Sequence, residues 1–441
     1  MIHCSRVALM FALSFAFTAN AQADWPQFRG SDGQGVAKNA NPPVKWSDKE
    51  KTKWSVDIAG KGWSSPVVMG NQIWVTTAVE HQPTEAQIKA AQEKTGLPDR
   101  QFAQRNVAGS ITLRAICVDA QTGKSIFDLE LFNVEAPDAI HTLNSYASPT
   151  PYIEKGRVYI HFGSNGTACV DSNTGEIVWK REISLYHSVG AGSSPVLFED
   201  VLILVCDGVH AQFVTALDKK TGETVWKTPR PEIRNTDGEH RKAFSTPLLI
   251  HHEGQPQLVS IGAQWLVSYD PRSGKEIWRV DHGAGFSNVA RPVYANGVVY
   301  VSTGFGKPQL WAVRVDGTGD VSDTHVLWKE SSQIPAKPSP LLVDGRIYVL
   351  SDSGILTCVD AKDGKSQWRE RIGGNYSASP ALIGKQIYLM SHEGTVTVCS
   401  PGGEYKELAK FELEKQIMAS PAVDGDAIIV RVGGTLSRVS N

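Results

Sequence analysis

The sequence predicts an all-β fold, an eight-bladed β-propeller of four-stranded antiparallel blades. Three observations support it: a proline before an apolar run recurs eight times, a nine-residue phrase from Asp to Trp recurs between these prolines, and the N-terminal segment can complete the shortened last repeat. The prolines lie 40 to 52 residues apart after a first interval of 85 residues. A period of this size is typical of repeat folds. The prolines are Pro66, Pro151, Pro195, Pro247, Pro292, Pro340, Pro380 and Pro421.

Each repeat is expected to contain four short strands. The proline opens the innermost strand, where its missing N–H does no harm. Glycine-containing turns lead to the second strand, such as residues 345–351, and to the third, such as residues 355–360. An Asp-x-x-x-Gly turn then leads to the fourth strand. Because one such sheet cannot bury both of its faces, the sheets stack face to face, and at this period they close into a ring.

The nine-residue phrase places an aromatic residue on the fourth strand. It occupies residues 171–179, 218–226, 270–278 and 360–368, and residues 119–127 repeat it with Phe in place of Trp. We expect each indole to pack between neighbouring blades, because it combines a large apolar surface with a polar N–H. The tryptophans expected in this role are Trp179, Trp226, Trp278, Trp328, Trp368 and Trp54.

The two ends of the chain are expected to share one blade. The eighth repeat stops one strand short of the pattern. Trp54 precedes Pro66 by 12 residues, the same spacing as Trp328 before Pro340. The N-terminal segment therefore supplies the missing outer strand, which removes the exposed edges of an open ring. We predict that residues 24–441 form a single domain.

Composition and the N-terminus favour an exported protein. With 20% charged residues and a formal net charge of −2, the chain is neither a disordered polymer nor a basic nucleic-acid binder. Residues 1–23 have the charge, apolar stretch and small-residue end of a cleaved signal peptide. Cys4 precedes the apolar stretch, so no lipid-anchored cysteine is expected and the protein is predicted to be a periplasmic or secreted monomer. The other cysteines show no metal, redox or disulfide spacing and are expected to be buried free thiols.

The first repeat contains a long insertion. Its proline and its Asp119 are 53 residues apart, about thirty more than in the other repeats. Within the predicted insertion, residues 79–110, Thr84 and Gln87 form a capping-box pair and Gly96 marks a helix end. A helix over the mouth of the ring would be a lid or a partner surface. A tolerated surface insertion is the alternative.

The Asp-x-x-x-Gly-x-x-x-Trp phrase resembles the tryptophan-docking motif of pyrroloquinoline quinone (PQQ) propellers. That fold is shared by quinoprotein dehydrogenases, BamB-type outer-membrane assembly lipoproteins and exported PQQ-like repeat proteins. Residues 24–35, 143–151, 302–310 and 373–380 are similar to the third group. The sequence departs from the dehydrogenases, because no two cysteines are adjacent and no haem extension is present. It departs from BamB in lacking a lipobox cysteine.

One face of the predicted ring carries chemically diverse loops. These loops precede each first strand or join the second and third strands, whereas the opposite face repeats Asp-Gly and Thr-Gly turns. Loops on a rigid ring are a common place for function, and the aromatic and basic members favour an anionic or ring-bearing ligand. The alternative is that these residues only cap turns. The predicted binding-face residues are His141, Asn144, Tyr146, His187, Asp207, His210, Gln212, Lys242, Phe244, Arg291, Phe305, Lys307, Asn375 and Tyr376.

Three functions stay open at this point. The first is a non-catalytic binding or scaffold protein of the cell envelope, with no cofactor and with a protein partner or small envelope ligand on the loop face. The second is a PQQ- and calcium-dependent oxidoreductase of alcohols or sugars, with Trp265 or Trp311 as the cofactor floor and Asp207 or Asp352 as the base. The third is a hydrolase or lyase of polysaccharide. No metal site is predicted, because the loop histidines lack a short ligand spacing.

Overall fold

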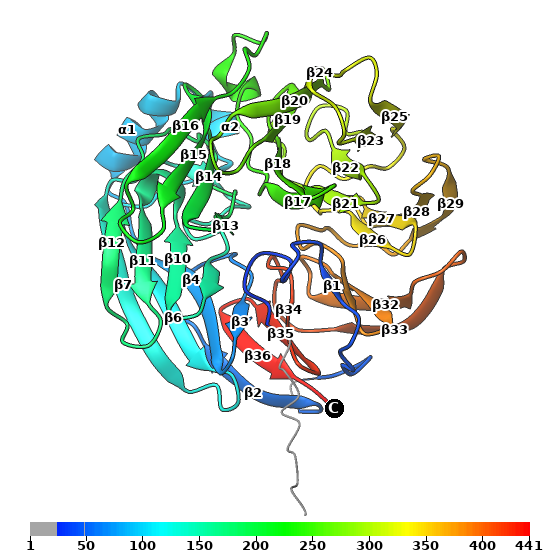
Figure 1. Ribbon diagram of the computed structural model, residues 1–441. Coiled ribbons are helices and arrows are strands. Elements are labelled where there is room, and N and C mark those ends of the chain that lie inside the picture. Colours follow the sequence, from blue (N-terminus) through cyan, green and yellow to red (C-terminus); the bar gives the residue numbers. More distant parts are fainter. Residues whose placement is uncertain (1–23, 48) are drawn as a thin grey trace, which may run out of the picture.

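The computed structural model describes residues 24–47 and 49–441, so the predicted signal peptide lies outside the described residues. Eight sheets of four consecutive or nearly consecutive strands form a ring (Figure 1). The predicted eight-bladed propeller is therefore confirmed. Blade 1 is β3 (Val67–Met69), β4 (Gln72–His81), β6 (Ser110–Asp119) and β7 (Ser125–Glu135); blade 2 is β9 (Tyr152–Glu154), β10 (Arg157–His161), β11 (Thr167–Asp171) and β12 (Ile177–Arg181). Blade 3 is β13 (Val196–Phe198), β14 (Val201–Asp207), β15 (Gln212–Asp218) and β16 (Thr224–Pro229); blade 4 is β17 (Leu248–His252), β18 (Gln255–Ile261), β19 (Trp265–Tyr269) and β20 (Glu276–Asp281).

The second half of the ring repeats the same strand order. Several short strands and helices lie outside the eight blades. Blade 5 is β21 (Val293–Ala295), β22 (Val298–Ser302), β23 (Leu310–Arg314) and β25 (Val326–Glu330); blade 6 is β26 (Leu341–Val343), β27 (Arg346–Leu350), β28 (Ile355–Asp360) and β29 (Ser366–Arg371). Blade 7 is β30 (Ala381–Ile383), β31 (Gln386–Met390), β32 (Thr395–Ser400) and β33 (Lys406–Glu412); blade 8 is β34 (Ala422–Asp424), β35 (Ala427–Val432), β36 (Thr435–Val439) and β2 (Thr52–Asp57). The small elements are β1 (Val36–Ala37), β5 (Arg105–Asn106), β8 (Ile140–His141), β24 (Gly319–Asp320), α1 (Glu85–Thr95), α2 (Asp99–Phe102) and the 3₁₀ helices η1 (Gly163–Asn165) and η2 (Gly238–His240).

The ring closes as the sequence predicts. Strand β2 pairs antiparallel with β36, and Trp54 lies opposite Arg438. The N-terminal segment thus supplies the outer strand of the last blade. Each of the eight prolines immediately precedes an innermost strand, β3, β9, β13, β17, β21, β26, β30 or β34. The five cysteines of the described chain outside the predicted signal peptide are buried and free.

Neighbouring blades are joined near their outer strands by tryptophans. The indole of Trp179 packs on the turn of the next blade, where a Cβ on Gly222 would lie 2.7 Å from the ring. Gly222 has φ +72°, so the turn needs glycine both for its backbone and for this close approach. Five indole Nε1 atoms donate to a carbonyl of the following blade at 3.0–3.2 Å: Trp54 to Ala120, Trp179 to Lys219, Trp226 to Pro271, Trp328 to Ala361 and Trp368 to Gly402.

The junction of blades 4 and 5 uses different contacts. Blade 5 lacks the Asp-x-x-x-Gly turn, and Trp278 is fully buried with its Nε1 bonded to Gln257 Oε1 at 2.9 Å. The amide of Gln257 then donates to Val315 O of blade 5 at 3.0 Å. Strand β24, which lies between β23 and β25 in the chain, pairs parallel with β20 across the same junction. Gln257 and β24 therefore replace the missing tryptophan-to-turn bond.

A second set of bonds joins the blades around the ring axis. Seven of the eight residues that precede these prolines donate their backbone N–H to the side-chain hydroxyl at the same position of the next blade, at 2.9–3.2 Å. Arg291 occupies the eighth position, so Thr246 finds no hydroxyl in blade 5 and the circle has one break. We call the seven hydroxyl residues the girdle: Ser65, Thr150, Ser194, Thr246, Ser339, Ser379 and Ser420.

The segment before β2 lies against one end of the ring axis. Trp25 exchanges two backbone hydrogen bonds with Val68 of blade 1, both 2.9 Å long. Further along, β1 pairs parallel with β30 of blade 7. Figure 1 shows this blue segment on the inner side of the ring. It therefore links the innermost strands of blades 1 and 7, which flank the closing blade 8.

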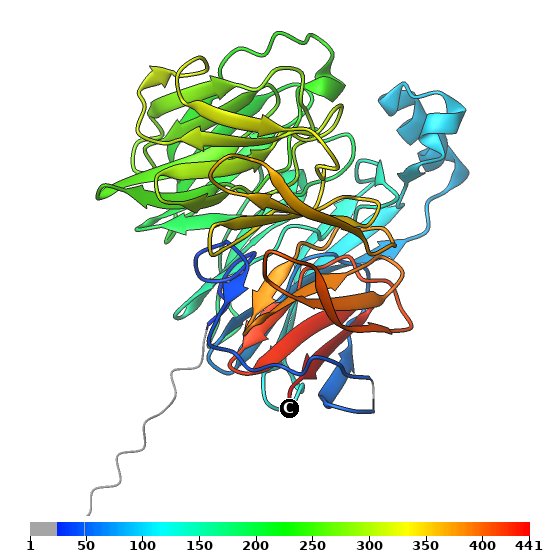
Figure 2. The same cartoon turned by 90° about the vertical axis from the view of Figure 1, so that its right-hand side faces the viewer.

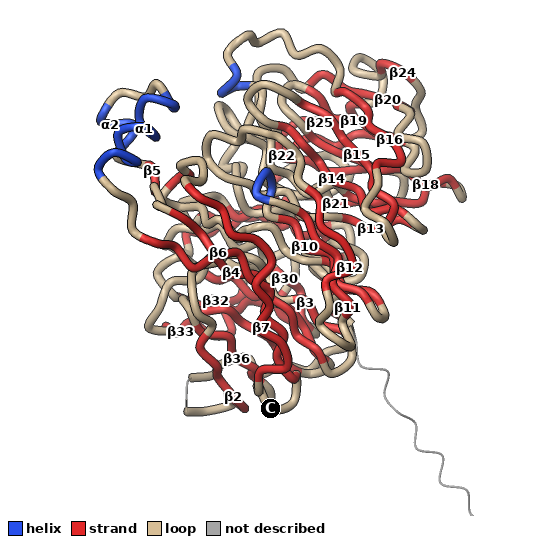
Figure 3. Tube along the Cα trace, turned by 90° about the vertical axis from the view of Figure 1, so that its left-hand side faces the viewer, coloured by secondary structure: helices blue, strands red, loops and turns tan. Residues whose placement is uncertain are grey.

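The insertion of blade 1 carries the predicted helix. Thr84 and Gln87 form the capping box of α1, and Gly96 ends it with φ +63°, which confirms both signals. Figures 2 and 3 show the two helices standing beyond one face of the ring, past the ends of β4 and β6. In Figure 1 they lie over the rim of the ring. The expectation that the helix covers the mouth of the ring is wrong, because the long hairpin β4–β6 carries it outward.

Trp226 is 8% exposed, and its replacement by Ala is expected to destabilise the protein by about 3–5 kcal/mol, because loss of the indole leaves a cavity between two blades. Trp226→Phe keeps most of the ring but loses the bond to Pro271 O, so about 1 kcal/mol is expected. Urea unfolding curves of the two variants and the wild type measure both values. Equal stability of Trp226→Ala and the wild type would contradict the packing role.

Candidate functional site

The structure distributes the predicted binding-face residues over very different environments. His210, Phe305, Lys307 and Asn375 are exposed, while His141, Asn144 and Gln212 are half-buried. Phe305 and Lys307 share one loop of blade 5, whereas His210 and Asn375 belong to loops of other blades. The buried members are Tyr146, His187, Asp207, Lys242, Phe244, Arg291 and Tyr376.

Several of the buried members hold the ring together. The carboxylate of Asp207 receives both Arg230 Nη2, at 2.8 Å, and Arg230 Nε, and both side chains are almost completely buried. Asp207 is therefore not accessible as a catalytic base. Tyr376 is 1% exposed and belongs to the apolar core between blades 6 and 7. Gln212 donates to Gly208 O at 2.6 Å and fixes its own hairpin.

Asn375 illustrates a surface member of the set. Its amide Nδ2 donates to Glu393 Oε1 at 2.8 Å, and its backbone N–H donates to the other carboxylate oxygen. Burial raises the pKa of Glu393, but these hydrogen bonds outweigh it and lower the pKa to about 2. The pair joins the loop before β30 to the following hairpin. Its role is therefore to stabilise these turns.

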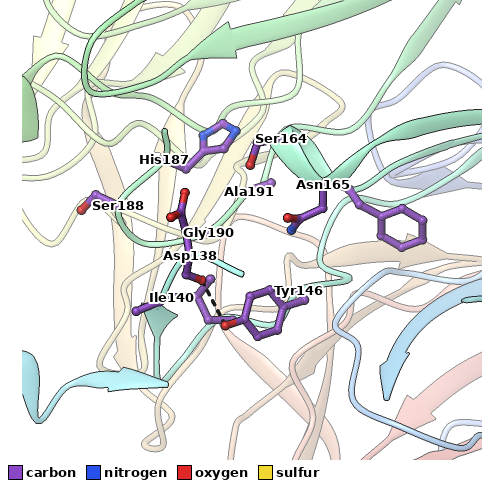
Figure 4. Close-up of a pocket in the computed structure, with 11 residues that line it drawn as sticks. Asp138, Ile140, Tyr146, Ser164, Asn165, His187, Ser188, Gly190 and Ala191 are labelled. Atoms are coloured by element: carbon purple, nitrogen blue, oxygen red, sulfur yellow. Dashed lines mark hydrogen bonds between the residues drawn. The ribbon is translucent and has the colours of Figure 1, made fainter. Parts of the chain in front are cut away.

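Two of the predicted residues, Tyr146 and His187, line one small crevice on the loop face (Figure 4). The crevice lies where blades 1, 2 and 3 meet, next to η1. Gly163 permits this arrangement, because a Cβ there would lie 3.2 Å from His187 Nε2 and Gly163 has φ +65°. The free space is about 20 Å³, enough for one water-sized group. The lining residues are Asp138, Ala139, Ile140, Tyr146, Phe162, Ser164, Asn165, His187, Ser188, Gly190 and Ala191.

His187 is the unusual side chain of this crevice. It is 8% exposed, and both ring nitrogens are buried without a hydrogen-bond partner in the described part of the chain. Burial lowers the pKa of His187 to about 4, so the imidazole is neutral near pH 7 and offers one donor and one acceptor. Figure 4 shows Asp138 and Ser164 beside the ring. The crevice can therefore hold a hydroxyl group or a water molecule.

Charged side chains around the crevice are paired. Lys94 of α1 forms an ion pair with Asp138, and Lys242 forms one with Glu239 while lying 3.4 Å from Ser188 Oγ. Asn144 fixes the loop by donating to Val189 O at 2.8 Å and to Ala191 O at 3.2 Å. The half-buried His141 donates its backbone N–H to Val189 O, and burial followed by Arg105 and two lysines lowers its pKa.

A larger cavity of about 80 Å³ lies on the ring axis. Its wall includes the girdle, and Phe28 of the N-terminal segment contributes to it. Sequence reasoning picked Phe244 but missed Phe28, Trp63 and the girdle as functional candidates. The signal was present, because Ser or Thr precedes seven of the eight prolines. The remaining lining residues are Gly192, Val289, Lys337, Ser377 and Met418.

Comparison with known proteins identifies the family. The family model described as outer membrane protein assembly factor BamB matches residues 36–228 and 262–405. The chain belongs to this PQQ-repeat family. It is 21% identical over 244 residues to the outer membrane protein assembly factor BamB of Moranella endobia, and 26% identical over 259 residues to a 1-butanol dehydrogenase (quinone) of Thauera butanivorans. These matches cover 52% and 55% of the chain but only 58% and 36% of the two relatives.

Solved structures show the same fold. BamB from Moraxella catarrhalis superposes with a TM-score of 0.57 at 13% identity, over 88% of this chain and 97% of that one. The quinohemoprotein alcohol dehydrogenase of Comamonas testosteroni gives a TM-score of 0.62 at 12% identity, over 94% and 80%. At these identities the likeness concerns the fold alone. Within residues 24–47 and 49–441, no helix is long and apolar enough to cross a membrane.

The axial cavity does not fit a calcium-bound quinone. Its lining contains no Asp, Glu, Asn or Gln, whereas calcium takes six to eight oxygen ligands that usually include carboxylates. Its volume is also far below the roughly 300 Å³ at which pockets for ring-sized ligands begin. The two tryptophans considered as a cofactor floor lie elsewhere: Trp265 donates to Glu232 O, and the ring of Trp311 is covered by Lys329 at 3.6 Å.

No metal site emerges from the loop histidines. His240 pairs with Asp237 at 2.9 Å and its ring contacts Phe286 edge-on at 4.4 Å. Among the described residues, no group of three or more His, Cys, Asp or Glu side chains is placed to hold a metal ion.

Acid is expected to destabilise the fold through His187. The unfolded chain takes up a proton near pH 6.5, whereas folded His187 resists protonation until about pH 4, so stability is lost as the pH falls between these values. The loss amounts to about 3 kcal/mol. His187→Gln removes this part of the pH dependence, and the exposed His210→Gln serves as the control. Unfolding curves at pH 7 and pH 4 measure it; identical pH dependence in His187→Gln and wild type would contradict the account.

Proposed function

We propose that this protein is an exported, non-catalytic binding or scaffold protein of the cell envelope, which engages a protein partner through its loop face. The observation that carries the proposal is the insertion of blade 1. None of the eleven residues of α1 is buried, so the helix adds nothing to the core of the ring. An isolated helix of this length is only marginally stable in water. Its position on a rigid hairpin beyond the loop face suits contact with another molecule.

The base of the insertion is firmly attached. Strand β5 pairs with β8, and Arg105 lies opposite His141. Lys94 joins Asp138 and lies 5.7 Å from the ring centre of Tyr186 in the loop before blade 3. Gln87 Nε2 donates to Gly109 O at 2.9 Å. The helix is thus held in one orientation while Ile88, 39% exposed, faces solvent. A preorganised surface of this kind reduces the entropic cost of binding.

The family match and the occupied carboxylates support the proposal of a binding role. The matching family carries the name of an outer-membrane assembly factor, and the quinone-dependent relative shares only part of its length with this chain. The carboxylates considered as bases are occupied: Asp207 by Arg230, and Asp352 by Lys337 at 3.5 Å and by the backbone N–H of Ala336. The N-terminal apolar stretch supports export to the periplasm or beyond.

Site-specific photo-crosslinking tests this proposal in the envelope of the native host. A benzophenone amino acid at Ile88 is expected to give a discrete protein adduct, because this side chain lies on the exposed helix. The same amino acid at Lys365, on the turn face, is the matched control and is expected to give none. Equal adducts from both positions, or none from positions on either face, would contradict a partner on the loop face.

Deletion of the insertion separates binding from folding. Joining residue 82 to residue 109 through a short glycine turn removes α1, α2 and β5; neither helix contains a buried residue, and Ala108 is the one buried residue lost. The variant is expected to keep its melting temperature within a few degrees and to lose the partner adduct formed by other loop-face positions. Saturable binding of PQQ with calcium, together with reduction of a dye by an alcohol, would instead replace the proposal by the oxidoreductase alternative.

A further inference from the structure

The polar groups that line the axial cavity are nearly all hydrogen-bond donors. Each girdle oxygen already accepts a backbone N–H from the preceding blade, and each hydroxyl retains its own proton to donate. Trp63 Nε1 is a buried donor without a partner in the described chain. Lys337 adds an ammonium group, which also lies 3.5 Å from Asp352 Oδ1, and no carboxylate belongs to the lining itself. Such a lining suits a ligand that only accepts hydrogen bonds.

Two buried guanidinium groups lie next to this cavity. Arg291 replaces the eighth girdle hydroxyl, and its Nη1 donates to Phe28 O at 2.5 Å. Arg29 donates to Pro340 O at 2.8 Å, directly after a girdle serine, and to Pro380 O at 3.2 Å. Both side chains are at most 2% exposed, and neither has a carboxylate within ion-pair distance among the described residues. Their partners are neutral oxygens.

No carboxylate forms an ion pair with either arginine in the described part of the chain, so their charges are compensated only in part. Burial, followed by the charge of Arg291, lowers the pKa of Arg29 to about 9, and burial lowers that of Arg291 to about 10. Both groups therefore stay charged near pH 7. Asp32, an exposed residue of the same segment, partly opposes the two shifts. Buried charges without a counter-charge are unfavourable, so a nearby anion would stabilise this arrangement.

A third buried arginine reinforces the positive character. Arg431 of blade 8 is 3% exposed, and its Nη1 donates to Ser64 Oγ at 3.0 Å and to Thr76 O at 2.8 Å. Its Nε and Nη2 atoms have no hydrogen-bond partner in the described part of the chain. Ser64 lies between Trp63 and Ser65, which both line the cavity.

We propose that the axial cavity binds a small oxyanion: phosphate, sulfate or the carboxylate of a small acid. The girdle hydroxyls, Trp63 Nε1 and Lys337 donate to its oxygens, and the buried arginines beside the cavity provide the attractive field. The volume of about 80 Å³ suits one such group rather than a ring system. This site is independent of the partner surface proposed above, since it uses the ring axis and not the insertion.

Titration calorimetry of the full mature chain with inorganic phosphate, sulfate and acetate, each against chloride at equal ionic strength, tests the proposal. One anion per chain is expected, with a matching rise in melting temperature, and the three arms identify the preferred oxyanion. Lys337→Met is expected to weaken binding by about tenfold or more, because it removes a charge-assisted bond. Lys365→Met, which also breaks a Lys–Asp pair but on the turn face, is the control and should bind as the wild type does.

A second variant guards against a folding defect. Trp63→Phe keeps most of the aromatic ring and breaks no girdle bond, but it removes from the cavity an indole N–H that has no partner in the described part of the chain, so affinity is expected to fall several-fold while circular dichroism stays unchanged. Failure of all three anions to bind more tightly than chloride would overturn the proposal. Equal affinity of Lys337→Met, Trp63→Phe and wild type would also overturn it, because the anion would then lie on the outer surface.

Discussion

The hydrogen bonds of the girdle are the constraint on which the remaining architecture depends. A backbone N–H buried at the axis of a ring has no strand partner, and leaving it unpaired costs about 1–3 kcal/mol. In seven of eight positions the next blade supplies a hydroxyl for it. The adjacent proline brings no N–H of its own. One Ser-Pro or Thr-Pro pair per repeat therefore sets both the start of each blade and its spacing from the next.

The same junction breaks the pattern at the axis and at the rim. Between blades 4 and 5 the girdle is interrupted at Arg291, and the tryptophan-to-turn bond is replaced by Gln257 and β24. Arg291 uses its side chain to bind the N-terminal segment, which crosses toward blade 7. The segment thus stabilises the ring where regular contacts are missing. It also brings Arg29 close to Arg291, beside a cavity whose lining includes the girdle hydroxyls, the Trp63 indole and the Lys337 ammonium group.

Sequence periodicity predicted the ring and its closure because both depend on features that recur in every repeat. The capping box of Thr84 and Gln87 depends only on residues close together in the chain, so the sequence predicted it as well. The environments of loop side chains are not periodic. Asp207 meets Arg230 across 23 positions, and Phe244 turns toward the axis two residues before Thr246, so their loop positions alone did not reveal burial. The girdle itself left a signal, since Ser or Thr precedes seven of the eight prolines.

A crystal structure of the mature protein soaked in selenate would test the central claim most directly. Selenate matches sulfate in shape and charge, and its anomalous scattering locates it without ambiguity. The account predicts one strong peak on the ring axis, within hydrogen-bonding distance of Lys337 and several girdle hydroxyls. An axis that holds only water molecules, with selenate confined to the outer surface, would contradict it.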